Sequence, residues 1–162
     1  MKLRKISLTG ISLLVVVTSV GAAPNCIVTK LTGEVEVTVK GLGRRKLAHL
    51  VPMERVVPGQ KVMYTLSVTN VCERPADDPV VAVAVPEHMT YVAGSAIGPN
   101  SIITYSVDGG FSYGAPVTLK VRAAEGAFRA ARPVEYTNIR WSMNKPLAEG
   151  AVAFARFIAV FQ

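Results

Sequence analysis

The sequence predicts an all-β protein, an immunoglobulin-like antiparallel β-sandwich of about 7–9 strands. Half of its 162 residues are apolar and only 18% are charged, which excludes a disordered chain and leaves enough material for one buried core. Valine is abundant, and valine suits the pleated, half-buried surface of a strand. Apolar and polar residues alternate in several short stretches, with turn-forming residues between them.

The first 22 residues are predicted to be a secretory signal peptide. A positively charged start is followed by an uncharged run, Ile6–Val20, and then by three small residues, Gly21–Ala23. Cleavage after Ala22 is favoured, because cleavage one residue later would place Pro24 directly after the scissile bond. The alternative is an uncleaved membrane anchor, which the serines, threonines and glycine within the run disfavour. The exported part is expected to comprise N-terminal strands over residues 23–55, tied to a sandwich domain over residues 56–162.

The charge balance argues against a nucleic-acid partner. Removing the leader takes away three positive charges, so the formal net charge falls from +7 to +4. The basic cluster Arg44, Arg45 and Lys46 follows glycines and has no aromatic residues interleaved. A solvated turn is favoured there over contact with anionic glycan, lipid head groups or another polymer.

Two cysteines, Cys26 and Cys72, are expected to form a disulfide in an oxidising compartment. Closing a loop of about 47 residues would stabilise the fold by roughly 4 kcal/mol in the chain-entropy treatment. The bond would tie the N-terminal strands to the end of the strand that begins near Val62. Two cysteines alone are too few ligands for a structural zinc site.

Four alternating stretches are the clearest strands. They cover residues 34–40, 62–69, 117–122 and 136–143, and in each one face suits a core and the other suits water. In the last of them Trp141 falls on the apolar face, so we expect it in the core rather than exposed as a sugar-stacking platform. Further strands are expected at Leu47–Val51, Val80–Val85, Ile102–Val107 and Val152–Phe161.

Turn residues separate these strands. Pro58–Gly59, Gly98–Asn100 and Asp108–Gly110 are strong turn signals. Only Ala123–Arg132 is ambiguous, because its alanines would permit a helical turn before Pro133.

The last strand, Val152–Phe161, is apolar on both faces except for Arg156. One interpretation is a strand covered on both sides by its own domain. The other is a surface that docks on another protein, with Phe157 and Phe161 on one face as candidate contacts. An open sheet edge could also accept the N-terminal segment of a neighbouring copy, which would give a dimer or a fibre.

Four motifs lie in order between Val56 and Phe161. They are Val57–Gln60 with Tyr64–Thr65 and Val68–Asn70, Met89–Ser95 after Pro86, Thr104–Gly110, and Tyr136–Trp141 with Leu147–Gly150. Together they resemble the conserved repeat domain of unknown function found in bacterial and archaeal cell-surface proteins. The resemblance implies an immunoglobulin-like sandwich in an exported or surface-attached protein, and it supplies no catalytic residues. Such domains usually carry an aspartate shortly before the proline that matches Pro86, whereas this chain reads Val83–Val85 there.

No catalytic site is expected. His49 and His88 have no partner at the spacing of a metal site or a catalytic triad. Asp77, Asp78 and Asp108 are expected to stabilise turns rather than to bind calcium, because no loop offers enough spaced oxygen ligands. No metal or cofactor is therefore predicted.

Two functions remain open. The first is an exported structural or adhesive module of the cell envelope or extracellular matrix, in the periplasm, at the cell surface or outside the cell. It would act by protein–protein contact with an envelope or surface protein, or by self-association. The second is a non-catalytic module that binds glycan or another envelope polymer, with Trp141, the tyrosines and residues 44–46 as candidate contacts.

Overall fold

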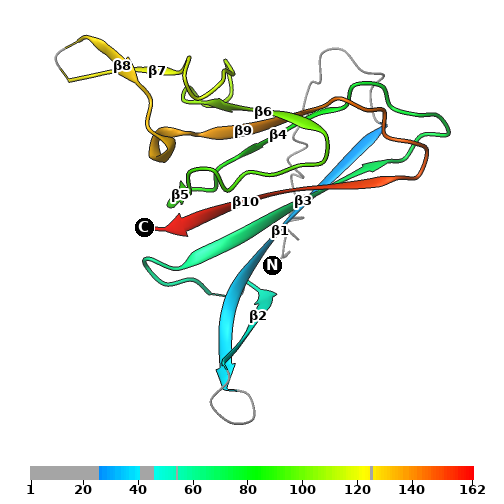
Figure 1. Ribbon diagram of the computed structural model, residues 1–162, viewed down its shortest axis with the longest axis horizontal. Helices are drawn as coiled ribbons and strands as arrows, with labels where there is room; N and C mark the ends of the chain where they lie inside the picture. The colour runs from blue at the N-terminus through cyan, green and yellow to red at the C-terminus, as the bar shows by residue number, and fades with distance from the viewer. Residues whose placement is uncertain (1–25, 41–45, 54, 125) are drawn as a thin grey trace, which may run out of the picture.

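The computed structural model describes residues 26–40, 46–53, 55–124 and 126–162, so the predicted signal peptide lies outside the described part. Ten strands and one short 3-10 helix make up the regular structure of the described residues (Figure 1). The strands are β1 (Ile27–Lys40), β2 (Lys46–Pro52), β3 (Lys61–Asn70), β4 (Val80–Ala84), β5 (Met89–Tyr91), β6 (Ser101–Ser106), β7 (Lys120–Arg122), β8 (Phe128–Ala130), β9 (Asn138–Met143) and β10 (Val152–Phe161), and the 3-10 helix spans Pro133–Glu135.

The strands form two packed sheets and a separate hairpin. The larger sheet has the order β2-β1-β3-β10-β5, and the smaller sheet has the order β4-β9-β6. Strands β7 and β8 pair only with each other. Every paired neighbour is antiparallel, which confirms the predicted all-β antiparallel sandwich.

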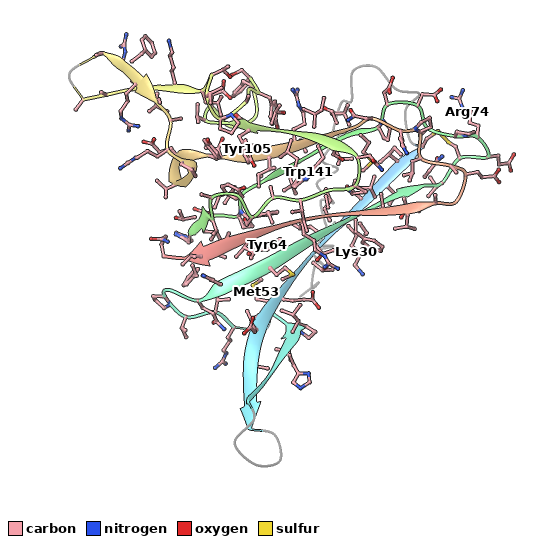
Figure 2. All side chains as sticks on the ribbon, in the orientation of Figure 1. Lys30, Met53, Tyr64, Arg74, Tyr105 and Trp141 are labelled. Atoms are coloured by element: carbon pink, nitrogen blue, oxygen red, sulfur yellow. A yellow bond between two sulfur atoms is a disulfide. The ribbon has the colours of Figure 1, made fainter. Side chains whose placement is uncertain are left out.

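The core lies between β3 and β10 of the larger sheet and β9 of the smaller one. Tyr64 stacks on Phe157 with ring centroids 5.0 Å apart, and Trp141 reaches across from β9 to lie 6.4 Å from the same ring (Figure 2). The predicted inward faces of these strands are confirmed, because β3 buries Val62–Val68 at alternate positions and β9 buries Ile139, Trp141 and Met143. Alternation predicted these faces correctly because each strand has one polar face.

For the last strand, the face proposed for partner contact was wrong. Phe157 is fully buried and Phe161 is half-buried, since their face points into the core. Ala155 and Ala159 flank Phe157 on that face, and their small side chains leave room for its ring between the sheets. The outward face instead carries Val152 and Phe154.

The predicted disulfide is confirmed. Cys26 and Cys72 are bonded, with their Cα atoms 5.0 Å apart. The main-chain N–H of Val71 donates to the carbonyl oxygen of Cys26 at 2.8 Å, so the bridge continues the pairing of β1 with β3. The N-terminal segment therefore lies in the sheet of its own chain, next to β3.

The ambiguous segment Ala123–Arg132 forms a hairpin turn and a strand rather than a helical turn. The N–H of Ala123 donates to the oxygen of Ala127 at 2.7 Å and closes the turn, and Gly126 supplies the positive φ of 84° that such a turn needs. The preceding strand is shorter than predicted. Only Lys120–Arg122 is extended, because Val117 lies in a turn.

Candidate functional surface

No candidate metal centre occurs in the part of the chain that the structure describes. No three His, Cys, Asp or Glu residues gather there in an arrangement that could hold a metal ion. His49 is exposed, and His88 lies on the surface with its Nε2 3.8 Å from the Oε1 of Glu87. None of the helices within the described ranges has the length and apolar character needed to span a membrane.

Asp108 stabilises a turn. Its carboxylate accepts hydrogen bonds from the hydroxyl of Ser106 at 2.6 Å and from the hydroxyl and N–H of Ser112 at 2.5 and 3.0 Å. These bonds, that of Ser106 first, hold the pKa of Asp108 well below its usual value. The carboxylate is thus engaged within its own loop, as its position in a turn predicted.

The aromatic residues suggested for glycan stacking are mostly in the core. Trp141 is fully buried, and four of the five tyrosines, Tyr64, Tyr91, Tyr105 and Tyr136, are buried. Burial, followed by the hydrogen bond with Tyr91, raises the pKa of Tyr105, and their two hydroxyl oxygens lie 3.1 Å apart. Trp141 therefore lies in the core as expected, and these rings are not available for stacking on a sugar because they fill the space between the sheets.

The basic cluster predicted at residues 44–46 cannot be placed as a surface. Arg44 and Arg45 lie outside the described residues. Lys46 begins β2, and its side chain is likewise outside the described part.

An apolar patch lies on the outer face of the larger sheet, at the end that carries the disulfide. We define it by four residues that are each about half exposed, Val28, Val71, Val152 and Phe154. The register places Val28 and Val152 on either side of Thr69 in one row across the sheet. Phe154 follows two residues after Val152 on the same face of β10, and Val71 follows Thr69 in the same way on the segment after β3.

Phe154 stands between two hollows. One, of about 450 Å³, is lined by Thr32, Thr65 and Arg156, which form the next row across the sheet, together with Glu34 and residues at the end of β2. The other, of about 510 Å³, lies between β10 and the segments at 99–100 and 143–147. Phe154 lines both hollows, with 54% of its surface exposed.

A polar row lies beside the patch. Lys30 and Ser67 share a row with Phe154, and the hydroxyl of Ser67 donates to the carbonyl oxygen of Lys30. In the adjacent hollow, the buried hydroxyl of Thr65 has no hydrogen-bond partner among the described residues. An apolar centre with polar residues around it is typical of a surface that contacts another molecule.

The sequence could not identify this patch, because its members are far apart along the chain. Val28 and Val152 become neighbours only through the pairing of β3 with both β1 and β10. The one available signal was that both faces of β10 are apolar, and alternation alone does not show which of them points outward.

Comparison of the chain with known proteins found no match. No family model matches the chain, and neither a curated protein nor a solved structure matches it, so its resemblance to the surface-protein repeat domain remains a prediction.

Proposed function

We propose that this chain is an exported structural or adhesive module of the cell envelope or extracellular matrix. It acts by protein–protein contact, and the apolar patch around Phe154 is its contact surface. The predicted leader and the disulfide between Cys26 and Cys72 support export, since such bonds persist in oxidising compartments.

The observation that carries the proposal is the exposure of Phe154. The other large aromatic residue of β10, Phe157, is fully buried and packs in the core, whereas Phe154 contributes nothing to that core. Its ring lies between two hollows and beside three half-exposed valines. Covering one phenylalanine and three valines would contribute on the order of a few kcal/mol to binding, and aromatic residues with this setting are frequent anchors of protein interfaces.

The alternative function is a module that binds glycan or another envelope polymer. It would use the same surface, because the hollow beside Phe154 is lined by Arg156 and by Thr65, whose hydroxyl has no hydrogen-bond partner among the described residues. A phenyl ring can pack against a sugar while neighbouring polar groups bond its hydroxyls.

A photo-crosslinking experiment separates these functions. Benzoylphenylalanine is placed at position 154 of the exported chain, and the same substitution at Phe111 is the control, because Phe111 is 94% exposed but lies in the loop after β6. We expect irradiation to give a discrete protein adduct from position 154 and none of that mass from position 111. Adducts that carry the mass of a polysaccharide would favour the glycan-binding function. Identical products from both positions would show that the patch is not a contact surface.

A further inference from the structure

The β7–β8 hairpin extends away from the sandwich (Figure 1). Its base is anchored by the buried side chains of Leu119 and Ala131, and the N–H of Ala131 donates to the carbonyl oxygen of Leu119 at 2.9 Å. Beyond this base all three side chains of β8 are exposed. An isolated two-stranded sheet is marginally stable in water. We therefore expect the exposed side chains of this hairpin to have a function.

The register of the hairpin places cations and an aromatic ring on one face. Lys120 pairs with Ala130 and Arg122 pairs with Phe128, so these four side chains share a face. Phe128 is 68% exposed, and the Cζ of Arg122 lies 5.8 Å from the centre of its ring. We call Lys120, Arg122 and Phe128 the arm face. None of its cations forms an ion pair with any residue that the structure describes.

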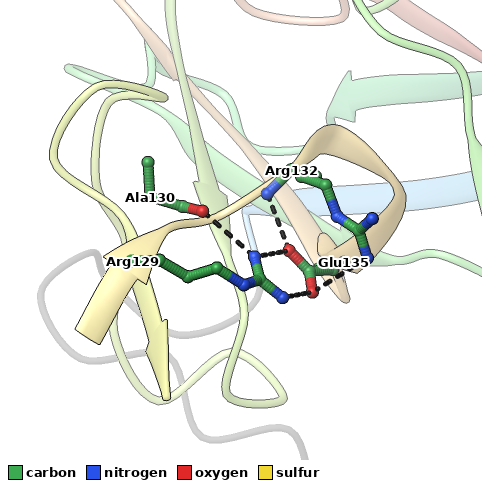
Figure 3. Close-up of polar contacts among 4 residues, drawn as sticks. All are labelled: Arg129, Ala130, Arg132 and Glu135. Atoms are coloured by element: carbon green, nitrogen blue, oxygen red, sulfur yellow. Dashed lines mark hydrogen bonds and ion pairs between the residues drawn. The ribbon is translucent and has the colours of Figure 1, made fainter. Parts of the chain in front are cut away.

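The opposite face of the hairpin is electrically neutralised. Arg129 donates to both carboxylate oxygens of Glu135, from Nη1 to Oε2 at 2.7 Å and from Nη2 to Oε1 at 2.5 Å (Figure 3). Glu135 also accepts from the main-chain N–H of Arg132 at 2.8 Å. This pair fixes the base of the hairpin to the 3-10 helix, and it takes no part in compensating Lys120 and Arg122, which form no ion pair with a described residue.

Positive charge is concentrated in two stretches of the sequence. Residues 120–132 contain four basic residues and one acidic residue, Glu125, a net charge of +3. Residues 40–46 contain four further basic residues and no acidic one. The rest of the chain after residue 22 has seven basic residues against ten acidic ones, so this remainder carries a net negative charge.

We propose that the arm face binds the surface of an anionic lipid bilayer. A projecting hairpin can reach a flat surface while the sandwich stays clear of it. The guanidinium of Arg122 and the ammonium of Lys120 match lipid phosphates, and the ring of Phe128 would enter the boundary between head groups and acyl chains. An acidic protein or a sugar-phosphate polymer would satisfy the two cations but would leave the exposed ring of Phe128 without an apolar environment.

Vesicle sedimentation tests the proposal. The purified exported chain is mixed with vesicles of phosphatidylcholine alone or with added phosphatidylglycerol. We expect it to pellet only with the anionic vesicles and to be released between roughly 0.1 and 1 M salt, over which electrostatic screening shortens from about 10 Å to about 3 Å. The double variant K120Q/R122Q should bind anionic vesicles at least about tenfold more weakly, because each basic residue near such a surface contributes separately to binding. F128S should also weaken binding, but the remaining binding should depend on salt as in the unaltered chain, because both cations are still present.

Matched controls remove the same charge or the same ring elsewhere. R55Q/R74Q removes two exposed cations outside the hairpin, and Arg74 lies at the far end of the molecule from it (Figure 2). F154S removes the exposed ring of the apolar patch. Both should bind anionic vesicles like the unaltered chain, and the fluorescence of buried Trp141 should show that every variant is folded.

Several results would overturn the proposal. Equal pelleting with neutral and anionic vesicles would exclude recognition of the charged surface. Equal loss of binding in R55Q/R74Q and K120Q/R122Q would show that net charge, and not the arm face, is responsible. Retention on immobilised polyglutamate that depends on Lys120 and Arg122, with no vesicle binding, would replace the lipid by an acidic protein partner.

Discussion

The side chain of Trp141 lies between the two sheets and joins them. Its indole Nε1 donates to the carbonyl oxygen of Ile97 at 3.1 Å, so the one polar atom of the ring is satisfied in the core. Gly98 follows, and a Cβ atom at that position would come within 2.6 Å of the indole Cδ1. The turn before β6 therefore needs a glycine because the ring occupies the adjacent space.

Replacing Trp141 by alanine should lower the free energy of unfolding by about 3–5 kcal/mol, because it empties a large buried site and removes one of the two hydrogen bonds that the oxygen of Ile97 accepts, the other coming from the N–H of Arg156. Ser142→Ala, on the opposite face of β9, should cost less than about 1 kcal/mol. Urea denaturation followed by circular dichroism measures both. Similar losses at the two positions would contradict the inward placement of Trp141.

Asn70 is the second side chain whose burial organises several segments. Its Nδ2 donates to the carbonyl oxygens of Arg74 at 2.7 Å and Leu147 at 2.9 Å, and its Oδ1 accepts from the N–H of Cys72 at 3.0 Å. Asn70 thus joins the end of β3, the loop after the disulfide and the connection into β10. The sequence singled it out only as the last residue of a motif, since hydrogen bonds to distant carbonyls leave no local pattern.

At the scale of elements, the predictability of a strand depended on how polar its outer face is. β3 and β9 alternate apolar with polar residues, so both their positions and their faces could be predicted. β10 is apolar on both faces apart from Arg156, so its alternation did not show that the face with Ala155, Phe157 and Ala159 is the buried one. The hairpin at β7 and β8 depends on a turn at Gly126, which composition alone could not distinguish from a helical turn.

The hairpin's anchoring should depend on pH through Glu135. The hydrogen bonds from Arg129, and then from the N–H of Arg132, lower the pKa of Glu135 from its usual 4.5 to about 2. A lowered folded-state pKa means that the stabilisation is complete above about 4.5 and is lost as the pH falls through about 2. Carbon NMR of the Glu135 carboxyl should therefore show a midpoint near 2.

The variant Glu135→Gln provides the control for that titration. It should keep the sandwich folded while the amide of Ala131 at the hairpin base exchanges faster with solvent. A carboxyl midpoint near 4.5 in the unaltered chain would mean that the ion pair of Figure 3 does not form in solution.

At the scale of the whole molecule, the disulfide joins residues that are 46 positions apart and fixes β1 against β3. The unaltered exported chain should show no free thiol when denatured without reductant. Replacing both Cys26 and Cys72 by alanine should reduce the free energy of unfolding by roughly 2–5 kcal/mol, because the open chain gains conformational freedom when unfolded. Two reactive thiols in the untreated protein would contradict the bond.

The apolar patch and the arm face belong to different parts of the molecule. The patch spans β1, β3 and β10 of the larger sheet, and the arm face belongs to a hairpin outside both sheets. F154S and K120Q/R122Q should therefore affect protein contact and lipid binding independently. A module with both surfaces could hold a partner protein close to a membrane.

The disulfide also determines how the domain carries mechanical load. β1 and β10 both run antiparallel to β3, so they are parallel to each other, and Cys26 and Phe161 lie near opposite ends of the sheet. Tension applied through these two ends shears the hydrogen bonds between strands along their length instead of opening them one after another. The covalent bond passes the force directly from Cys26 to Cys72, so the chain between them cannot be extended. Stretching is limited to residues 73–162 until the bond is reduced, and β1 is protected from tension even if β10 is pulled from the sheet.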